Sequence, residues 1–208
     1  MTLATSPGPD PALAAAKQAL RQDAAARRAN LARDNDGTAA QSLCDRLRAA
    51  LDAAGGIAGD AVVSGYWPLG DEMDPRPAMR SLHEAGRRVA LPVVSGRDRP
   101  LLFREWTPAS ALTEGAFRVM EPGPGAAELE PRVLLVPLLA FDRAGRRLGW
   151  GAGFYDRTIA ALRDRGPCLA IGIAWAGQRV AAVPADDFDE SLDLIVTEAG
   201  AIPPEDRP

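Results

Sequence analysis

The amino-terminal part of the chain carries apolar side chains at helical spacing, and this pattern ends at a pair of glycines. A first helix is predicted over residues 10–33, with Asp10 as its N-cap and Pro11 at its first position. A second helix is predicted over residues 38–56 from the four-residue spacing of Leu43, Leu47 and Leu51. Residues 1–9 are expected to be mobile.

Within the first helix, apolar and basic residues tend to opposite faces. The apolar face is expected to consist of Leu13, Ala16, Leu20, Ala24 and Leu31, with the arginines largely on the other face. Lys17 and Arg21 are four residues apart, so they project next to each other from one stripe of this helix.

From residue 61 onwards, short aliphatic runs alternate with helical segments. Strands are predicted at 61–67, 88–94, 101–106, 133–136, 168–175 and 192–197, and helices at 75–86 and 154–165. Residues 121–125 give the strongest loop signal, and a Pro-rich tail from Ile202 is expected to be loose. Aliphatic strands separated by helices predict a three-layer, Rossmann-like α/β fold with a mainly parallel sheet and helices on both faces. Such sheets bind ligands at the carboxyl ends of their strands.

Composition indicates one soluble globular domain over residues 1–208, since 47% of the residues are hydrophobic and 25% are charged. The net charge of −4 argues against a dedicated nucleic-acid binder. No apolar run is long enough to span a membrane, and residues 1–11 lack the layout of a signal peptide. Cys44 and Cys168 lack metal-binding spacing and are interpreted as free, buried thiols in a reducing compartment. We therefore expect a cytoplasmic monomer that interacts with neither nucleic acid nor a membrane.

Two residue types occur only once. His83 is the single histidine and lies in a predicted helix with no nucleophile or acid motif near it, so a structural or surface role is expected. Most hydrolase and zinc mechanisms are thereby excluded. Lys17 is the only lysine beside many arginines, and it is either a chance survivor of a coding bias or a required compact charge.

The most informative stretch is 133–157, VLLVPLLAFDRAGRRLGWGAGFYDR. A buried strand ends at Pro137, a polar turn follows, and three alternate glycines then lead into a helix that begins near Phe154. A glycine loop before a helix N-terminus offers backbone N–H groups to an anion. The spacing is neither the dinucleotide fingerprint nor the Walker loop, so the pattern alone leaves an ordinary surface turn open.

The string AFDRAGRRLGWGAGFYDR resembles the signature of the 5-formyltetrahydrofolate cyclo-ligase (methenyltetrahydrofolate synthetase) family. Weaker blocks in the same order extend the resemblance from about Lys17 to Glu198. They are KQALR at 17–21, YWPLGDE at 66–72, ALPVV at 90–94, MEP at 120–122, and VP at 183–184 with Asp189 and LDLIVTE at 192–198.

The resemblance implies closure of 5-formyltetrahydrofolate to 5,10-methenyltetrahydrofolate with ATP and Mg²⁺, releasing ADP and phosphate through a phosphorylated formyl group. By resemblance, the ATP-binding residues are Lys17, Arg21, Arg147, Leu148, Gly149, Trp150, Gly151, Ala152, Gly153, Phe154 and Tyr155. The folate-binding residues are Trp67, Glu72 and Trp150, and the metal ligands are Asp156 and Asp189. Arg146 is expected to be a surface neighbour.

Three residues depart from the family pattern: Ala152, Phe154, where tyrosine is common, and Phe188, where a polar residue is more usual. Two other functions stay open at this stage. One is a different phosphate-binding enzyme that uses only the glycine loop, and the other is a folate-binding protein that has lost turnover.

Overall fold

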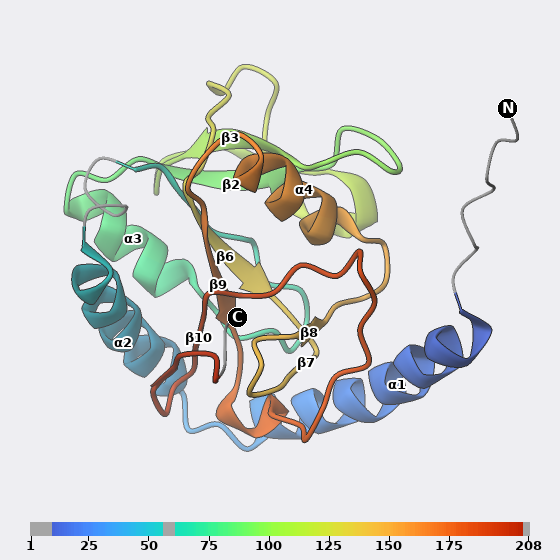
Figure 1. The fold of residues 1–208 in the computed structure, drawn as a ribbon. Helices are drawn as coiled ribbons and strands as arrows, with labels where there is room; N and C mark the ends of the chain where they lie inside the picture. The colour runs from blue at the N-terminus through green and yellow to red at the C-terminus, as the bar shows by residue number, and fades with distance from the viewer. Residues whose placement is uncertain (1–9, 56–60, 206–208) are drawn as a thin grey trace, which may run out of the picture.

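The computed structural model describes residues 10–55 and 61–205, which form a twisted central sheet with helices packed on both of its faces (Figure 1). Three predictions fall wholly or partly outside the described residues. They are the mobility of residues 1–9, the end of the second helix at Gly56, and the loose tail at its last three residues. The predicted three-layer α/β fold is confirmed.

Seven strands form the central sheet in the order β11-β10-β9-β6-β1-β2-β3. The five inner strands are parallel: β1 (Val63–Ser64), β2 (Val89–Val93), β6 (Val133–Pro137), β9 (Leu169–Ile173) and β10 (Leu194–Val196). Both edge strands, β3 (Leu102–Trp106) and β11 (Ala201–Ile202), are antiparallel to their neighbours. The parallel core places the carboxyl ends of β1, β2, β6 and β9 at one edge.

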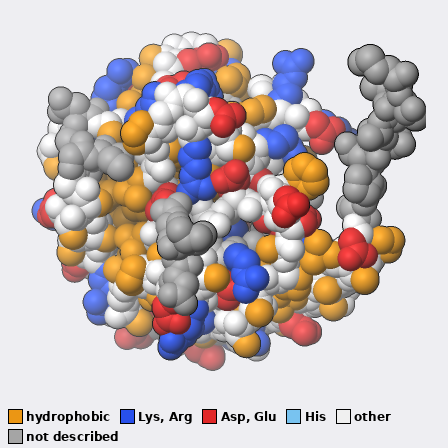
Figure 2. All heavy atoms as spheres, in the orientation of Figure 1, with side chains coloured by type: hydrophobic (Ala, Val, Ile, Leu, Met, Phe, Trp, Pro, Cys, Tyr) orange, Lys and Arg blue, Asp and Glu red, His pale blue; other side chains and the backbone are white. Residues whose placement is uncertain are grey.

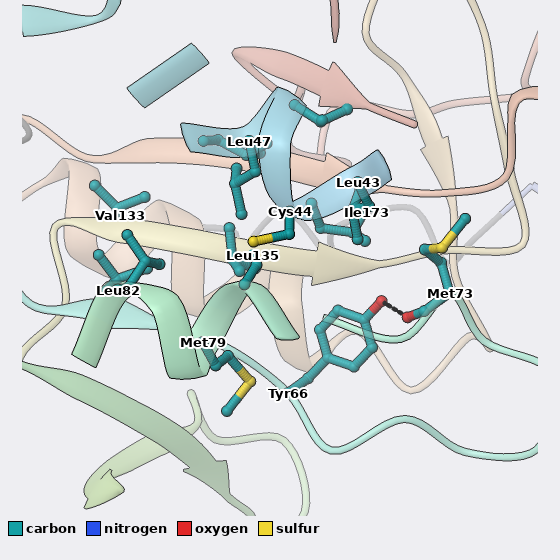
Figure 3. Close-up of a cluster of buried hydrophobic side chains, with 14 of the residues drawn as sticks. Leu43, Cys44, Leu47, Tyr66, Met73, Met79, Leu82, Val133, Leu135 and Ile173 are labelled. Atoms are coloured by element: carbon teal, nitrogen blue, oxygen red, sulfur yellow. Dashed lines mark hydrogen bonds between the residues drawn. The ribbon is translucent and has the colours of Figure 1, made fainter. Parts of the chain in front are cut away.

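Alternate side chains of β6 enter two different cores, which explains its unbroken apolar run. Val133 and Leu135 pack under α2 (Ala39–Ala53) and α3 (Arg76–Glu84). Leu134 and Val136 pack on the opposite face, under α4 (Phe154–Arg163). Figure 3 shows the first of these cores, where Leu43, Cys44 and Leu47 of α2 meet Val133 and Leu135.

The first core also holds a loop that leads to the cavity described below. The hydroxyl of Tyr66, which follows β1, donates a hydrogen bond of 2.6 Å to the carbonyl oxygen of Met73 (Figure 3). This bond closes the loop between β1 and α3. Tyr66 is only 3% exposed, so the bond also satisfies a buried hydroxyl group.

Helix α1 (Pro11–Arg33) runs along the end of the sheet (Figure 1) and begins as predicted, with the Asp10 side chain accepting a hydrogen bond from the Ala12 N–H. Its predicted apolar face is partly wrong. Ala16 is exposed, whereas Lys17 and Arg21 are half-buried and Arg28 is buried. The inward face therefore carries three cations, because acidic side chains and a loop carbonyl inside the protein receive them.

Three further predictions need correction. Strand β1 has only two residues, against the seven predicted at 61–67. Glu121 and Pro122, predicted as loop, lie in β5 (Met120–Pro122), which pairs with β4 (Leu112–Glu114). A two-stranded ribbon tolerates this proline because each of its strands has an unpaired edge. Ile202, predicted as loose, pairs with Ile195 and packs on the second core.

Other surface and composition predictions have clear outcomes. Cys44 and Cys168 are both free and buried, as predicted. His83 lies half-buried on α3, away from the cavity described below. No helix of residues 10–55 and 61–205 is long and apolar enough to cross a membrane. Figure 2 shows basic and acidic side chains intermixed over one face of the molecule.

Candidate active site

A cavity of about 590 Å³ opens at the carboxyl ends of the parallel strands and is large enough for a ligand of drug or cofactor size. Its walls come from α1, the loop after β1, the β4–β5 hairpin, the glycine loop and the start of α4. Every residue predicted from the sequence for ATP, folate or metal lines this one cavity. The fold therefore brings Lys17, Glu72 and Asp189 to one cavity, although they lie far apart in the sequence.

The glycine loop follows a polar turn that is closed by hydrogen bonds to Asp142. Strands β7 (Ala140–Phe141) and β8 (Arg147–Leu148) form a hairpin closed by Asp142, which is 1% exposed. The Asp142 carboxylate accepts hydrogen bonds from the backbone N–H groups of Ala144, Arg146 and Val183. Arg146 pairs with the same carboxylate, and its side chain is 42% exposed, as expected for a surface neighbour.

Two of the loop glycines have backbone angles that other residues rarely adopt. Gly151 has a φ of +99°, and Gly153, with a φ of +66°, is the N-cap of α4. A Cβ atom at Gly151 would lie 3.0 Å from Nη2 of Arg21. Arg21 itself donates a 2.9 Å hydrogen bond from Nε to the Gly149 carbonyl oxygen. Arg21, which the sequence assigned to ATP binding, therefore hydrogen-bonds to the backbone of the glycine loop.

Lys17 projects from α1 into a pair of carboxylates. Its Nζ lies 2.5 Å from Oδ2 of Asp189 and 2.9 Å from Oδ2 of Asp186. Burial opposes the charged form, but the hydrogen bonds and charges of these two aspartates outweigh it and raise the pKa of Lys17. In turn, the hydrogen bond from Lys17 lowers the pKa of Asp186. The ammonium is thus a fixed positive charge at the cavity wall.

Arg147 and Asp156 form a second charged pair beneath the glycine loop. Nη2 of Arg147 donates to Oδ1 of Asp156 at 2.7 Å, and Nη1 donates to the Glu190 carbonyl oxygen at 2.5 Å. The Glu190 N–H closes the triangle with a 3.1 Å bond to Oδ1 of Asp156. Burial lowers the pKa of Arg147, although the nearby carboxylates oppose this shift. The triangle ties the start of α4 to the segment that carries Asp189.

The predicted metal ligands, Asp156 and Asp189, both line the cavity. Within residues 10–55 and 61–205 there is no cluster of three or more His, Cys, Asp or Glu side chains arranged to hold a metal ion. Two carboxylates without a full protein cage fit Mg²⁺, which commonly takes one or two carboxylates together with phosphate oxygens and waters. Their chemistry therefore fits a metal that enters with a phosphate ligand.

Glu72 also lines the cavity, and its side chain is 6% exposed. Oε2 accepts a 2.9 Å bond from the Leu69 N–H, and Oε1 lies 3.4 Å from Nη1 of Arg28. Burial raises the pKa of Glu72, while the Leu69 N–H and the charge of Arg28 act against this shift. A buried carboxylate of this kind can accept hydrogen bonds from donors on a ligand.

Aromatic side chains supply the apolar walls of the cavity. Trp67 stacks under the guanidinium of Arg76 at 5.1 Å, and Trp150 is 61% exposed at the loop tip. Phe154, at the start of α4, meets Phe117 of the β4–β5 hairpin edge to face, with ring centroids 5.8 Å apart. Burial raises the pKa of Tyr155 far above its ordinary value, so its hydroxyl stays protonated.

Comparison with known proteins now decides the family. Residues 13–198 match the model of the 5-formyltetrahydrofolate cyclo-ligase family. The chain belongs to this family. It is therefore an enzyme of the ligase class, in folate-dependent one-carbon metabolism.

Individual relatives agree with this family assignment. The 5-formyltetrahydrofolate cyclo-ligase of Escherichia coli (strain K12) is 36% identical over 131 residues, which cover 61% of this chain and 71% of the relative. The Mycolicibacterium smegmatis cyclo-ligase is 35% identical over 143 residues, or 65% of this chain and 72% of the relative. The solved structure of the Aquifex aeolicus 5,10-methenyltetrahydrofolate synthetase has a TM-score of 0.70 and 27% identity, covering 92% of this chain and 94% of that one.

Sequence reasoning missed several residues of this cyclo-ligase cavity. Phe117, Val119 and Glu121 come from the hairpin that was not predicted. Glu121 lies in the MEP block of the family resemblance but was given no role, and no sequence signal pointed to Phe117 or Val119. Arg28, which contacts Glu72 but does not itself line the cavity, was also missed, although its spacing along the helix could have indicated it. It follows Arg21 by seven residues, two helical turns, and so lies on the same face of α1 as Lys17 and Arg21.

Proposed function

We propose that this chain closes 5-formyltetrahydrofolate to 5,10-methenyltetrahydrofolate, using MgATP and releasing ADP and phosphate. One observation carries the proposal. A cation on α1, a glycine loop at a helix N-terminus and a buried carboxylate line the same cavity in a member of this enzyme family. A triphosphate and a folate could therefore lie in contact, as a phosphoryl transfer between them requires.

The reaction needs activation because a formamide oxygen is a poor leaving group. The formyl oxygen attacks the γ-phosphorus, the bond from that phosphorus to the bridging oxygen breaks, and ADP leaves. N10 then attacks the formyl carbon, the carbon–oxygen bond breaks, phosphate leaves and N10 loses its proton. Phosphoryl transfer asks the protein chiefly for positioning and charge neutralisation. The absence of histidine from the cavity lining is compatible with this chemistry.

Phosphate binding falls to the loop and to α1. The N–H groups of the glycine loop and the first turn of α4 supply donors and a partial positive charge. Lys17 supplies a compact positive charge, and Arg147 supplies a buried one beside Asp156. Arg21 contributes by holding the loop through the Gly149 carbonyl, and its guanidinium, which also contacts Oε1 of Gln18, would donate further hydrogen bonds to the triphosphate.

Asp156 and Asp189 would hold the Mg²⁺, each with oxygens at the cavity wall. When bound, the ion supplies neutralisation of the charge that develops on the phosphate oxygens. Asp189 accepts from Lys17 in this structure, so Lys17 exchanges that carboxylate for phosphate oxygens as the nucleotide enters. The Arg147 contact keeps Asp156 oriented throughout.

Folate binding falls to the loop after β1. Glu72 would accept hydrogen bonds from the donor edge of the pterin, while Trp67 and Trp150 pack on its faces. The fixed position of Oε2 against the Leu69 N–H keeps the carboxylate oriented before the ligand arrives. Pre-organisation of this kind lowers the entropy cost of binding.

An isotope experiment tests the phosphorylated formyl group directly. The substrate is labelled with ¹⁸O at the formyl oxygen, and the phosphate released during turnover is analysed by mass spectrometry. The mechanism requires the label to appear in phosphate. Label appearing in water, with none in phosphate, would contradict it.

A further inference from the structure

Arg28 is a buried cation beside Glu72, the carboxylate that we assign to folate binding. Its side chain is 3% exposed. Nε and Nη2 lie 2.9 Å and 2.6 Å from Oδ1 of Asp71, and Nη1 lies 3.4 Å from Oε1 of Glu72. A single guanidinium therefore holds two consecutive side chains of the loop after β1.

The same guanidinium also reaches the glycine loop. Its central carbon lies 5.4 Å from the ring centroid of Trp150. Trp150 stands between two glycines and is 61% exposed, and its side chain also hydrogen-bonds to Glu72. Arg28 thus joins the loop assigned to folate with the loop assigned to phosphate, and it does so from the helix that carries Lys17.

Stability alone does not account for this arrangement. Burying the Arg28 guanidinium and the Glu72 carboxylate carries a desolvation penalty that well-packed apolar side chains of similar volume avoid. The loop has a second anchor in any case, because Nε1 of Trp175 donates to the Asp71 carbonyl oxygen at 3.1 Å. By contrast, a planar guanidinium can hydrogen-bond to a carboxylate and stack on an indole at the same time. It can therefore orient the Glu72 carboxylate and the Trp150 ring together.

We propose that Arg28 is a positioning residue that sets the Glu72 carboxylate and the Trp150 indole in the geometry that binds the folate. This inference rests on the proposed function, because it assigns a purpose to side chains that would hold that ligand. Arg28 acts through Glu72 and Trp150 and is not itself among the residues that line the cavity.

The primary test is the affinity for 5-formyltetrahydrofolate without ATP, measured by titration calorimetry so that no turnover occurs. Arg28→Lys keeps the positive charge but loses the planar guanidinium and its several N–H donors. It is expected to weaken folate binding about tenfold or more, as for a lost hydrogen bond to a charged group. Arg27→Lys is the matched control, because Arg27 is the exposed neighbour on the same helix and donates a hydrogen bond to the Arg179 carbonyl oxygen. Its affinity is expected to equal that of the wild type.

A double-mutant cycle separates positioning from a general structural role. If Arg28 acts through Glu72, Arg28→Lys costs much less folate affinity in a Glu72→Gln background than in the wild type. Equal losses in both backgrounds would overturn the proposal. So would a lower melting temperature for Arg28→Lys with unchanged folate affinity. Should Arg28→Lys not fold, Asp71→Asn replaces it, with severalfold weaker binding expected and unchanged affinity as the contrary result.

The pH profile of binding gives a further readout. The charged or titratable groups that face Glu72 are Arg28 from α1, Tyr66 after β1 and Tyr155 from α4. Arg28 holds the pKa of Glu72 down, so in Arg28→Met the loss of folate binding on acidification should begin at a higher pH than in the wild type. Coincident profiles would contradict the assigned role.

These outcomes distinguish the inference from the function on which it rests. Wild-type protein that binds no 5-formyltetrahydrofolate would remove the proposed function and the role of Arg28 with it. Wild-type protein that binds the folate, together with Arg28→Lys that binds it equally well, would overturn the role of Arg28 alone.

Discussion

Lys17 Nζ lies 2.5 Å from Oδ2 of Asp189, across 172 residues of sequence. The only lysine of the chain therefore meets a predicted metal ligand at the cavity wall. Under the proposed function, Lys17 would supply positive charge to the triphosphate and Asp189 negative charge to its metal ion. The approach of MgATP would separate the two partners, giving each a ligand of opposite charge.

Lys17→Ala should lower kcat/KM by about a hundred- to a thousandfold, as when one electrostatic stabiliser of a transition state is lost. The fold should persist, because α1 remains anchored by Arg28. Formation of methenyltetrahydrofolate, followed by near-ultraviolet absorbance, measures the effect, and Arg27→Ala is the control. Turnover at the wild-type rate would show that Lys17 has no part in phosphate binding.

Asp186→Asn should tighten MgATP binding by about two- to fivefold, the range expected for a partly exposed ion pair. Asp186 holds Lys17 at 2.9 Å and therefore competes with phosphate for it. Asparagine can still accept the Phe188 N–H bond, so the loop should keep its shape. Calorimetry with a non-hydrolysable ATP analogue measures the change, and the exposed Asp187→Asn is the control. Weaker binding in Asp186→Asn would contradict the competition.

Asp156→Asn should raise the Mg²⁺ concentration needed for half-maximal turnover by about tenfold or more. The substitution removes a ligand charge and disturbs the bond to Arg147. Asp164→Asn, at the exposed carboxyl end of the same helix, should leave the requirement unchanged. Equal Mg²⁺ dependence in both variants would remove Asp156 from the metal site.

The sequence predicted the residues that line the cavity better than the residues that hold them in place. The glycine loop and its helix are contiguous, so local backbone geometry is enough to predict them. The Glu190 backbone, which binds both Arg147 and Asp156, reaches the site only through tertiary packing. Ile202 was misjudged because edge pairing with Ile195 overrode the Pro-rich composition. Hydrophobic patterning likewise predicted that the arginines of α1 largely face solvent. The groups that bind Arg21 and Arg28, the Gly149 carbonyl and the Asp71 carboxylate, come from distant parts of the chain.

Gly151→Ala should lower the free energy of unfolding by about 1–3 kcal/mol, because alanine is strained at a φ of +99°. Its Cβ would also press on Arg21 at 3.0 Å. Gly149→Ala is a matched comparison in the same loop, since a Cβ there meets no heavy atom within 4 Å. Urea unfolding of both variants measures the difference. Equal stabilities would mean that the loop relaxes to accept the side chain.

Glu72→Gln should change how stability depends on pH. Burial raises the pKa of Glu72 in the folded state, so the folded protein binds this proton more tightly than the unfolded chain does. The wild type should therefore gain stability relative to Glu72→Gln as the pH falls from neutrality through the raised pKa. Thermal unfolding of both proteins across this range tests the sign. A wild type that loses stability relative to the variant on acidification would contradict it.

Glu72→Ala should mainly weaken folate binding and leave the affinity for MgATP close to that of the wild type. The residue lies in the loop after β1, whereas the residues assigned to phosphate lie on α1, in the glycine loop and on α4. Separate calorimetric titrations with folate and with a non-hydrolysable ATP analogue measure the two affinities. An unchanged folate affinity would remove Glu72 from the binding site.

The most direct test of the central claim mixes purified protein with 5-formyltetrahydrofolate and MgATP and follows methenyltetrahydrofolate by its near-ultraviolet absorbance. The account predicts a rise that needs both ATP and Mg²⁺ and that yields one ADP for each methenyltetrahydrofolate formed. No rise under these conditions would contradict it. Folate binding that persisted without turnover would then identify a binding protein with an inactive phosphate site.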